Sequence, residues 1–376
     1  MFEFWTEQTT PLAFAMVAAL VALIVLPMNI KFIDEQLGYF CLLIGGAMLW
    51  LACRLETVVF VHGEFVQRLM AAPREELHTM LLDPWLLILS YFTLSLLSIV
   101  FRKRIEREVR AWTRVLPAHV LIGLWTLVIG SLGSLSVVVM ATVGSIFFRT
   151  LQQVKRRDYT PSVVAYSAAI GISALLTTVG EPLSLFIARN LGEGTPYLLR
   201  TFGGVCAINA VFLALVAAWL ARGAGPLAAP EAAEERQNLR QEVDGLLHST
   251  AKVLFFVWGL LFFGEAVKPI AAHLFEDMHP FVAFFGNSVS AVADNALLGL
   301  LEIRHHTQQE DVMILGLSLA FWGVGLVPGN ICNIVLKEKL GISFGMWARY
   351  GMPLACALAV LNFTLVLLGA GYWLTF

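Results

Sequence analysis

The chain has 376 residues, of which 58% are hydrophobic and 14% are charged. A mean hydropathy of +0.77 excludes an ordinary soluble domain and predicts a polytopic membrane protein. The formal charge of −2 gives no indication of nucleic-acid binding, because the basic residues are dispersed along the chain. Apolar runs of about 20 residues recur, which predicts spanning helices, since the strands of a membrane barrel are only about 10 residues long.

The predicted spans follow one another between charged breaks. They cover residues 11–30, 37–53, 85–101, 161–188, 198–221, 250–275, 311–336 and 349–375. The first span lacks the basic stretch and cleavage site of a secretory signal, so we expect it to be retained. Residues 54–83 mix charged and apolar side chains, and they fit either an interfacial amphipathic helix or an extension of the second span.

Two further apolar segments do not fit this series. Pro117–Phe148 is interrupted by a stretch rich in Gly and Ser, and it is too short to cross the bilayer twice. Basic residues flank it on both sides, and basic loops stay in the cytoplasm, so we predict a re-entrant hairpin. Pro280–Glu302, interrupted near Gly286, fits a second hairpin or a single crossing, and the distribution of Lys and Arg favours the hairpin.

An internal match divides the chain into two halves. With an offset of 149 residues Glu181 aligns with Asn330, and with an offset of 153 Ser134 aligns with Asn287. Each half then reads span, hairpin, broken span, span, and the two halves run in opposite directions, as in the inverted repeats of secondary transporters. Chance similarity between apolar helices is the alternative.

These features define the predicted fold class and domains. The fold is an all-α polytopic membrane protein, an inverted repeat with two re-entrant hairpins and two discontinuous transmembrane helices. Its parts are an N-terminal segment of transmembrane helices and an amphipathic stretch (1–84), a first inverted repeat (85–221), a cytoplasmic linker (222–249) and a second inverted repeat (250–376).

The first predicted interruption carries a carboxylate. Pro182 removes a backbone donor and Gly180 frees the chain, so the helix should unwind there and release carbonyl groups. Glu181 lies between them, and acids at this depth are typical of ion or proton paths. Together with the hydroxyls of Thr178 and Ser184, these oxygens would suit sodium. A helix kink in which Glu181 bonds a neighbouring helix is the alternative.

The second half contributes amides and one acid. Asn330 and Asn333, in the second interruption, offer amide oxygens that coordinate without titrating, or they cap freed backbone groups. Asp294 and Asn295 lie in the second hairpin, where a structural pairing with a nearby donor is the alternative. Two close carboxylates cannot both ionise cheaply unless a cation lies between them. We therefore predict a sodium ion at Glu181 and Asp294, for which protons compete.

Other polar residues give weaker indications. Glu265 and Lys268 lie one turn apart, which favours an interfacial pair over a second proton site at Glu265. His305 and His306 lack a spaced partner, so a solvated loop is favoured over a metal site. The five cysteines show no Cys-x-x-Cys pattern and are expected to be core thiols. No nucleotide loop or catalytic triad is recognisable, so we predict neither an enzyme nor a cofactor.

Three motifs resemble those of the sodium/proton antiporter families in the ion transporter superfamily. They are Gly180-Glu181-Pro182-Leu183-Ser184, Ala293-Asp294-Asn295 and Pro328-Gly329-Asn330-Ile331-Cys332-Asn333-Ile334. The superfamily includes NhaD-type antiporters and dicarboxylate transporters, and the resemblance covers residues 85–376. NhaD-type antiporters carry Asp-Asn in the first hairpin as well, where this chain has Ala141 and Thr142.

The resemblance implies that the two hairpin tips meet two unwound helices at the substrate site of an often dimeric, elevator-like transporter in the inner (plasma) membrane of a bacterium. It places Asp294 and Asn295 on the hairpin Asp-Asn and Glu181 on the acidic position of the first broken helix. The tip residues would then line the site; they are Ser134, Ser136, Thr142, Asn287, Ser288 and Ser290.

The predicted function is secondary active antiport of sodium, or another monovalent cation, against protons. Its partners would be the lipid bilayer, the transported ions and a second copy of the chain in a homodimer. The alternative is a sodium- or proton-coupled symporter of a carboxylate or other small anion. No Lys or Arg lies within the motifs to bind an anion, although half-helix N-termini could do so. A non-transporting scaffold is disfavoured by the buried acids.

Overall fold

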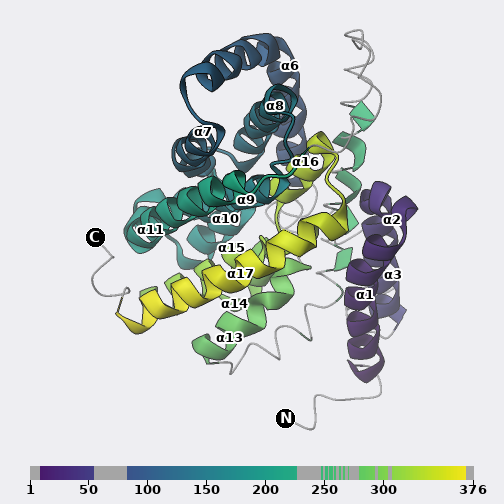
Figure 1. The fold of residues 1–376 in the computed structure, drawn as a ribbon. Coiled ribbons are helices and arrows are strands. Elements are labelled where there is room, and N and C mark those ends of the chain that lie inside the picture. Colours follow the sequence, from purple (N-terminus) through teal and green to yellow (C-terminus); the bar gives the residue numbers. More distant parts are fainter. Residues whose placement is uncertain are drawn as a thin grey trace. The chain divides into compact units, whose positions relative to one another are not determined.

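The computed structural model describes residues 9–54, 83–226 and 279–369, except 293–294 and 304–306, together with scattered positions between 247 and 270. Every regular element in these residues is helical, and no strand occurs among them (Figure 1). Apolar spans build helices because a backbone in lipid must satisfy its hydrogen bonds internally. The predicted all-α class is confirmed for this part of the chain.

Four of the described helices are long and apolar enough to cross a membrane. They are α1 (Thr9–Asn29), α8 (Val137–Lys155), α11 (Thr195–Arg222) and α17 (Phe344–Leu367). Three shorter apolar stretches cover Leu37–Ala52, Ala118–Ser134 and Thr160–Leu176. These lengths and compositions are those of a membrane protein, as the sequence predicts.

Two helices extend beyond the predicted apolar segments. α6 (Asp83–Val115) continues well past residue 101, through the basic stretch that we expected to end the span. Arg, Lys and Glu favour helices, and Arg102 pairs with Glu106 one turn on at 2.7 Å. α8 likewise runs past Phe148 to Lys155, so the second leg of the predicted hairpin is a full-length helix.

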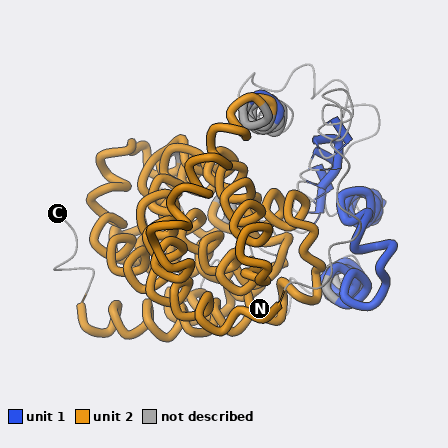
Figure 2. The backbone as a smooth tube through the Cα atoms, turned by 45° about the horizontal axis from the view of Figure 1, so that its top comes forward, with its two compact units in different colours: residues 1–93, 247–278 blue, residues 94–246, 279–376 orange. Residues whose placement is uncertain are grey.

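The chain forms two compact units, drawn in different colours in Figure 2. Unit 1 comprises residues 1–93 and 247–278, and unit 2 comprises residues 94–246 and 279–376. This division by packing is not the predicted division into repeats and linker, whose boundaries stay predictions.

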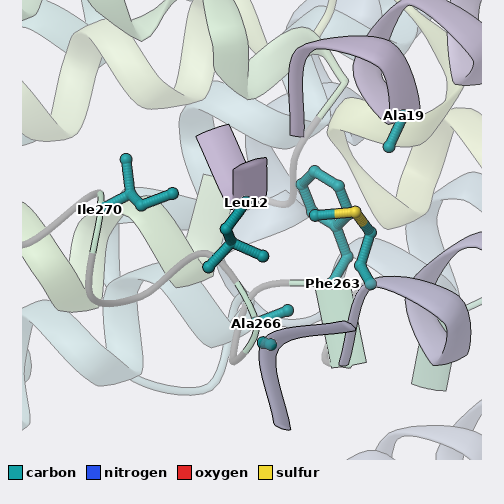
Figure 3. Close-up of a cluster of buried hydrophobic side chains, with 7 residues drawn as sticks. Leu12, Ala19, Phe263, Ala266 and Ile270 are labelled. Atoms are coloured by element: carbon teal, nitrogen blue, oxygen red, sulfur yellow. The ribbon is translucent and has the colours of Figure 1, made fainter. Parts of the chain in front are cut away.

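Unit 1 contains α1, α2 (Lys31–Glu35) and α3 (Leu37–Arg54). Its core joins α1 and α3 to residues 263–270, and Leu12, Phe263 and Ala266 lie side by side in it (Figure 3). Leu12 and Ala266 are fully buried. Burial of these side chains stabilises the unit by about 25 cal/mol for each Å² of apolar surface.

Glycines let α3 approach the segment at residues 252–259 of unit 1 closely. A Cβ added at Gly45 would lie 1.9 Å from the carbonyl oxygen of Gly259, and one at Gly38 would lie 2.2 Å from that of Lys252. The contact points are seven residues apart on both sides, which puts them on one helix face. Packing through small residues is typical of helices that associate in membranes.

Unit 2 contains a similar series of elements twice. The first series is α7 (Ala118–Trp125), a π turn (Thr126–Gly130), a 3₁₀ turn (Leu132–Ser134), α8, α9 (Thr160–Ser173), a 3₁₀ turn (Ala174–Leu176), α10 (Pro182–Leu191) and α11. The second series is α13 (Pro280–Gly286), a 3₁₀ turn (Asn287–Ala291), α14 (Asn295–Glu302), α15 (Gln309–Trp322), a 3₁₀ turn (Val327–Gly329), α16 (Ile331–Leu340) and α17.

The spacing between the two series equals the offset found in the sequence. The last three helices of each series begin 149 residues apart, at residues 160, 182 and 195 and at residues 309, 331 and 344. α10 and α16 are both followed by a glycine with positive φ, Gly192 at 68° and Gly341 at 66°. Only glycine adopts this conformation without strain, so it ends both helices in the same way. The opposite orientation of the series and the re-entrant path of the hairpins stay predictions.

Candidate functional site

Each series of unit 2 contains one interrupted helix. α9 ends at Ser173 and α10 begins at Pro182, while α15 ends at Trp322 and α16 begins at Ile331. Proline starts α10 at the first helical position, where its missing N–H costs nothing. The interruptions therefore cover residues 174–181 and 323–330, where Gly and Pro predict them.

The two interruptions meet at one hydrogen bond. The side-chain nitrogen of Asn330 donates to Oε2 of Glu181 at 3.1 Å. Glu181 is 6% exposed and Asn330 is 3% exposed, so the contact lies inside the protein. The two residues align under the 149-residue offset, and equivalent residues of two halves touch when they lie close to the axis that relates them.

A glycine in α9 leaves room for Asn330 at this contact. A Cβ added at Gly171 would lie only 2.9 Å from the side-chain nitrogen of Asn330. Asn330 also caps α16, because its Oδ1 accepts from the backbone N–H of Cys332 at 3.2 Å. The amide of Asn330 is thus fixed at both ends, and its donor side faces Glu181.

Asn333 supports the second interruption. Its side-chain nitrogen donates to the carbonyl oxygens of Gly323 and Leu326, both at 2.8 Å, and its Oδ1 accepts from the hydroxyl of Ser167 in α9 at 2.7 Å. Two carbonyl groups released by the break are therefore satisfied by one side chain. The predicted contact of Asn333 with an ion stays a prediction.

The two predicted hydroxyls of the first interruption bond nearby groups. Ser184 donates to the carbonyl oxygens of Thr177 at 2.6 Å and Glu181 at 2.8 Å. The hydroxyl of Thr178 lies 3.2 Å from that of Thr195 at the start of α11. Ser184 therefore lies directly beneath the acidic residue, whereas Thr178 ties the interruption to the next helix.

The tip of the first predicted hairpin contacts the first interruption. Thr177 donates to the carbonyl oxygen of Ser134, and the backbone N–H of Val137 donates to the carbonyl oxygen of Gly180 at 3.1 Å. Ser136 caps α8, accepting from Val139 at 3.4 Å. A tip and an interruption thus come together within the first series.

Thr142, the remaining predicted residue of the first hairpin, lies farther along α8. It is 1% exposed, and its hydroxyl has no hydrogen-bond partner in the described part of the chain. A buried hydroxyl in this state costs free energy, so it is available to a polar ligand.

The tip of the second predicted hairpin contacts α15 and the second interruption. The side-chain nitrogen of Asn287 donates to Oε2 of Glu302 at 2.8 Å and to the hydroxyl of Ser318 at 2.7 Å. Ser290 donates to the carbonyl oxygen of Leu319 at 3.2 Å. A Cβ added at Gly329 would lie 2.8 Å from the carbonyl oxygen of Ser290. Only a glycine fits where this tip meets the break.

The remaining predicted site residues are placed as follows. Ser288 is partly exposed beside Asn287. Asn295 begins α14 at 3% exposure, and its side-chain nitrogen has no hydrogen-bond partner among the described residues. Asp294 and Glu265 lie outside the described residues, so the distance from Glu181 to Asp294 stays a prediction.

Three polar residues of this region were not predicted as site residues. They are Ser167, Glu302 and Ser318. Glu302 served only as the end of an apolar segment, yet it lies two turns after Asn295 on the same helix face, which is the signal that points inward. Ser167 and Ser318 are single hydroxyls in apolar helices, and nothing in their sequence neighbours distinguishes them.

Packing between the series surrounds the two interruptions. α8 of the first series packs against α16, and α10 packs against α14 of the second series. The meeting point combines a buried carboxylate, amide groups and released carbonyls. Among the described residues, no group of three or more His, Cys, Asp or Glu side chains could hold a metal ion. This donor set is one of hard oxygen ligands, which suit alkali cations and protons better than transition metals.

A family model described as "Protein of unknown function (DUF1646)" matches residues 13–368. The chain belongs to the DUF1646 family. A search of curated proteins gives no significant match. The DUF1646 match includes α1–α3 as well as both series of unit 2, whereas the resemblance drawn from the motifs begins only at residue 85. Because the family description names no activity, the function of this DUF1646 protein is argued from its site.

Proposed function

We propose that the protein is a secondary active transporter that exchanges sodium, or another monovalent cation, for protons across a bacterial inner membrane. The contact between Glu181 and Asn330 carries the proposal. It joins a buried carboxylate to the second of two interrupted helices. Interrupted helices that meet in the interior are the usual site of ion binding in secondary transporters.

The chemistry of the contact supports exchange between a cation and protons. A buried carboxylate needs a positive partner when it is ionised and none when it is protonated. Sodium and a proton therefore compete for Glu181, and binding one releases the other. Asn330 donates to one carboxylate oxygen and fixes its direction, and Asp294 would add the second carboxylate to the site.

We also propose that the two series of unit 2 form an inverted repeat with re-entrant hairpins. Two contacts that recur at the repeat offset support this. Ser173 donates to the carbonyl oxygen of Gly130 at 2.7 Å, and Trp322, 149 residues later, donates to that of Phe284 at 2.9 Å. Both bonds tie the last turn of the helix before the break to its own hairpin.

Contacts across the series recur with exchanged roles. Asn190 in α10 donates to the carbonyl oxygen of Ile303, after α14, at 2.8 Å. Lys339, which is 149 residues after Asn190, accepts from Arg149 of α8 at 2.5 Å through its carbonyl oxygen. Such crosswise pairs are what a two-fold relation between halves produces. The resemblance to the ion transporter superfamily and a homodimer belong to the same proposal.

One observation favours the second candidate, a coupled symporter of a carboxylate or other small anion. α10 and α16 both begin at the interruptions, so two helix N-termini lie beside Glu181 and Asn330. N-termini carry partial positive charge and bind carboxylates in transporters. The buried carboxylate of Glu181 opposes an anion at the same place, which is why we rank exchange first.

Proteoliposomes with an internal pH dye test the proposal. We expect an inward sodium gradient to raise the internal pH as protons leave, and we expect Glu181→Gln to abolish the signal. Glu193→Gln, which changes the same side chain in the exposed turn after α10, is the matched control and should keep the wild-type rate.

Two outcomes would contradict the exchange mechanism. If no alkali cation evokes proton movement, exchange is wrong, and sodium-dependent uptake of a labelled dicarboxylate would then favour the symporter. If Glu181→Gln keeps the wild-type proton signal, the exchange does not use this carboxylate.

A further inference from the structure

Unit 2 has a basic cavity remote in sequence from both interruptions. It measures about 340 Å³ and is lined by His119 at the start of α7, Lys155 at the end of α8, Tyr159 and Arg157 before α9, and Arg222 at the end of α11. We call it the basic pocket. Side chains from four separate places in the chain converge there, so it is a built cavity and not one face of a single helix.

Backbone contacts hold the pocket in shape. The guanidinium of Arg157 donates to the carbonyl oxygen of Ala224 at 3.3 Å, and the backbone N–H of Asp158 donates to that of Gly225 at 3.0 Å. Lys155 donates to the carbonyl oxygen of Thr113 at 3.1 Å. The segments after α8 and α11 are thus bonded to one another, and a ligand would meet a preformed site at little entropic cost.

The charge in the pocket is uncompensated. No carboxylate lines it, and none of its three cations forms an ion pair with a carboxylate in the described residues. The nearest acid in sequence, Asp158, accepts instead from the backbone N–H of Thr160 at 2.9 Å and from its hydroxyl at 2.6 Å, where α9 begins. Two guanidinium groups and an ammonium group around one cavity suit a phosphate, which accepts several such bonds.

An apolar stripe leads along α11 to the pocket. Val211, Leu215 and Trp219 are 51%, 66% and 68% exposed, and Arg222 follows on the same helix face at the next turn. α11 is one of the helices able to cross a membrane, so this stripe would face lipid chains. A polar cavity at the end of an exposed apolar stripe has the shape of a phospholipid, with its headgroup and one chain.

We propose that the basic pocket binds the phosphate of an anionic phospholipid whose acyl chain lies along Val211, Leu215 and Trp219. Basic pockets between the cytoplasmic ends of helices are known to hold such headgroups. The segments that carry Arg157 and Arg222 are both predicted to be cytoplasmic, where anionic lipid is available. This inference does not depend on the proposed transport activity, because the pocket shares no residue with the site at Glu181.

Native mass spectrometry of the purified full-length protein tests the inference. The protein is titrated with phosphatidylglycerol and, separately, with phosphatidylcholine, and bound lipids are counted. Each cation near a headgroup contributes on the order of 1 kcal/mol, so Arg157→Gln with Arg222→Gln should weaken phosphatidylglycerol binding about 30-fold. Lys103→Gln with Arg107→Gln, the same change in charge on one face of α6, is the matched control and should leave it unchanged.

A second arm distinguishes a lipid from free phosphate. We expect phosphatidylglycerol to raise the melting temperature of the protein, and Trp219→Ser to reduce that rise, while inorganic phosphate at millimolar concentration has little effect. Equal stabilisation by inorganic phosphate, insensitive to Trp219→Ser, would replace the lipid with a soluble anion. Equal binding of both lipids, or no loss in the Arg157→Gln, Arg222→Gln protein, would overturn the site.

Discussion

At the residue scale, Gly171 is the simplest test of the contact between the two interruptions. An added Cβ would lie 2.9 Å from the side-chain nitrogen of Asn330, and this amide is the movable end of a side chain. Gly171→Ala should therefore displace the amide without unfolding the protein. Loss of one hydrogen bond to a charged group costs about 1.5 to 3 kcal/mol, so we expect sodium affinity to fall at least tenfold.

The control for this substitution is Gly203→Ala in α11. No atom lies within 4 Å of the Cβ that it would add. Sodium binding by Gly203→Ala should equal that of the wild-type protein, measured with labelled sodium on purified protein. Equal loss in both variants would mean that helix glycines matter in general and that the contact with Asn330 does not.

A second residue-scale prediction concerns the cluster of Asn287, Glu302 and Ser318. One amide nitrogen serves both other side chains, at 2.8 and 2.7 Å. Asn287→Ala leaves buried acceptors without their donor and should lower the free energy of unfolding by about 1 to 3 kcal/mol. A double-mutant cycle of Asn287→Ala with Glu302→Ala, measured by denaturant titration, should give a coupling of at least about 0.5 kcal/mol. Additive effects would show that the bond contributes nothing.

At the element scale, the adjacent glycines of α3 give a matched pair. A Cβ at Gly45 would lie 1.9 Å from the carbonyl oxygen of Gly259, whereas one at Gly46 meets nothing within 4 Å. Gly45→Ala must push apart two helix backbones and should destabilise unit 1 by roughly 1 to 3 kcal/mol. Gly46→Ala should be neutral or slightly stabilising, because alanine favours helix. Thermal unfolding of the two variants decides this, and equal melting temperatures would contradict the packing.

The end of α16 gives a prediction that depends on pH. Lys339 lies beyond the predicted span, and burial, together with the charges of Arg149 and Arg102, lowers its pKa to about 8. An unfolded lysine titrates near 10.4, so the unfolded state binds the proton more tightly and the native state is penalised most below pH 8. Lys339→Met should remove a cost of about 2 to 3 kcal/mol at pH 7.

The pH profile separates this effect from a simple gain in packing. The advantage of Lys339→Met should shrink between about pH 8 and 10.5 as the unfolded lysine loses its proton. Lys31→Met, at a side chain that is 85% exposed, should change little at any pH. An advantage of Lys339→Met that stays constant up to pH 10.5 would rule out the charge as its cause.

Element types were predictable from the sequence because hydropathy and helix breakers are local. Gly180 and Pro182 predict the first interruption, and the structure breaks the helix there. The length of α6 was not predictable from hydropathy, since its basic half is held by helix propensity and pairs such as Arg102 with Glu106. Glu302 was missed for a different reason: its partner Asn287 is 15 residues away and reaches it only through the fold.

At the scale of the whole molecule, the predicted orientation can be tested by cysteine labelling. In a background without the five native cysteines, Gln153→Cys, near the end of α8, should react with an impermeant maleimide only in inside-out vesicles. Glu193→Cys, after α10, should react only in intact cells. Both positions are exposed, so access to the reagent depends on the side of the membrane alone. Labelling of Gln153→Cys from outside would remove the first re-entrant hairpin.

The central claim is that sodium and protons compete for the carboxylate of Glu181 where two interrupted helices meet. The most direct measurement is the affinity of the purified protein for labelled sodium as a function of pH. Competition with one proton predicts that the apparent affinity falls about tenfold for each pH unit on the acidic side, and that Glu181→Gln removes this dependence. Sodium binding that is independent of pH, or that keeps its pH dependence in Glu181→Gln, would contradict the claim.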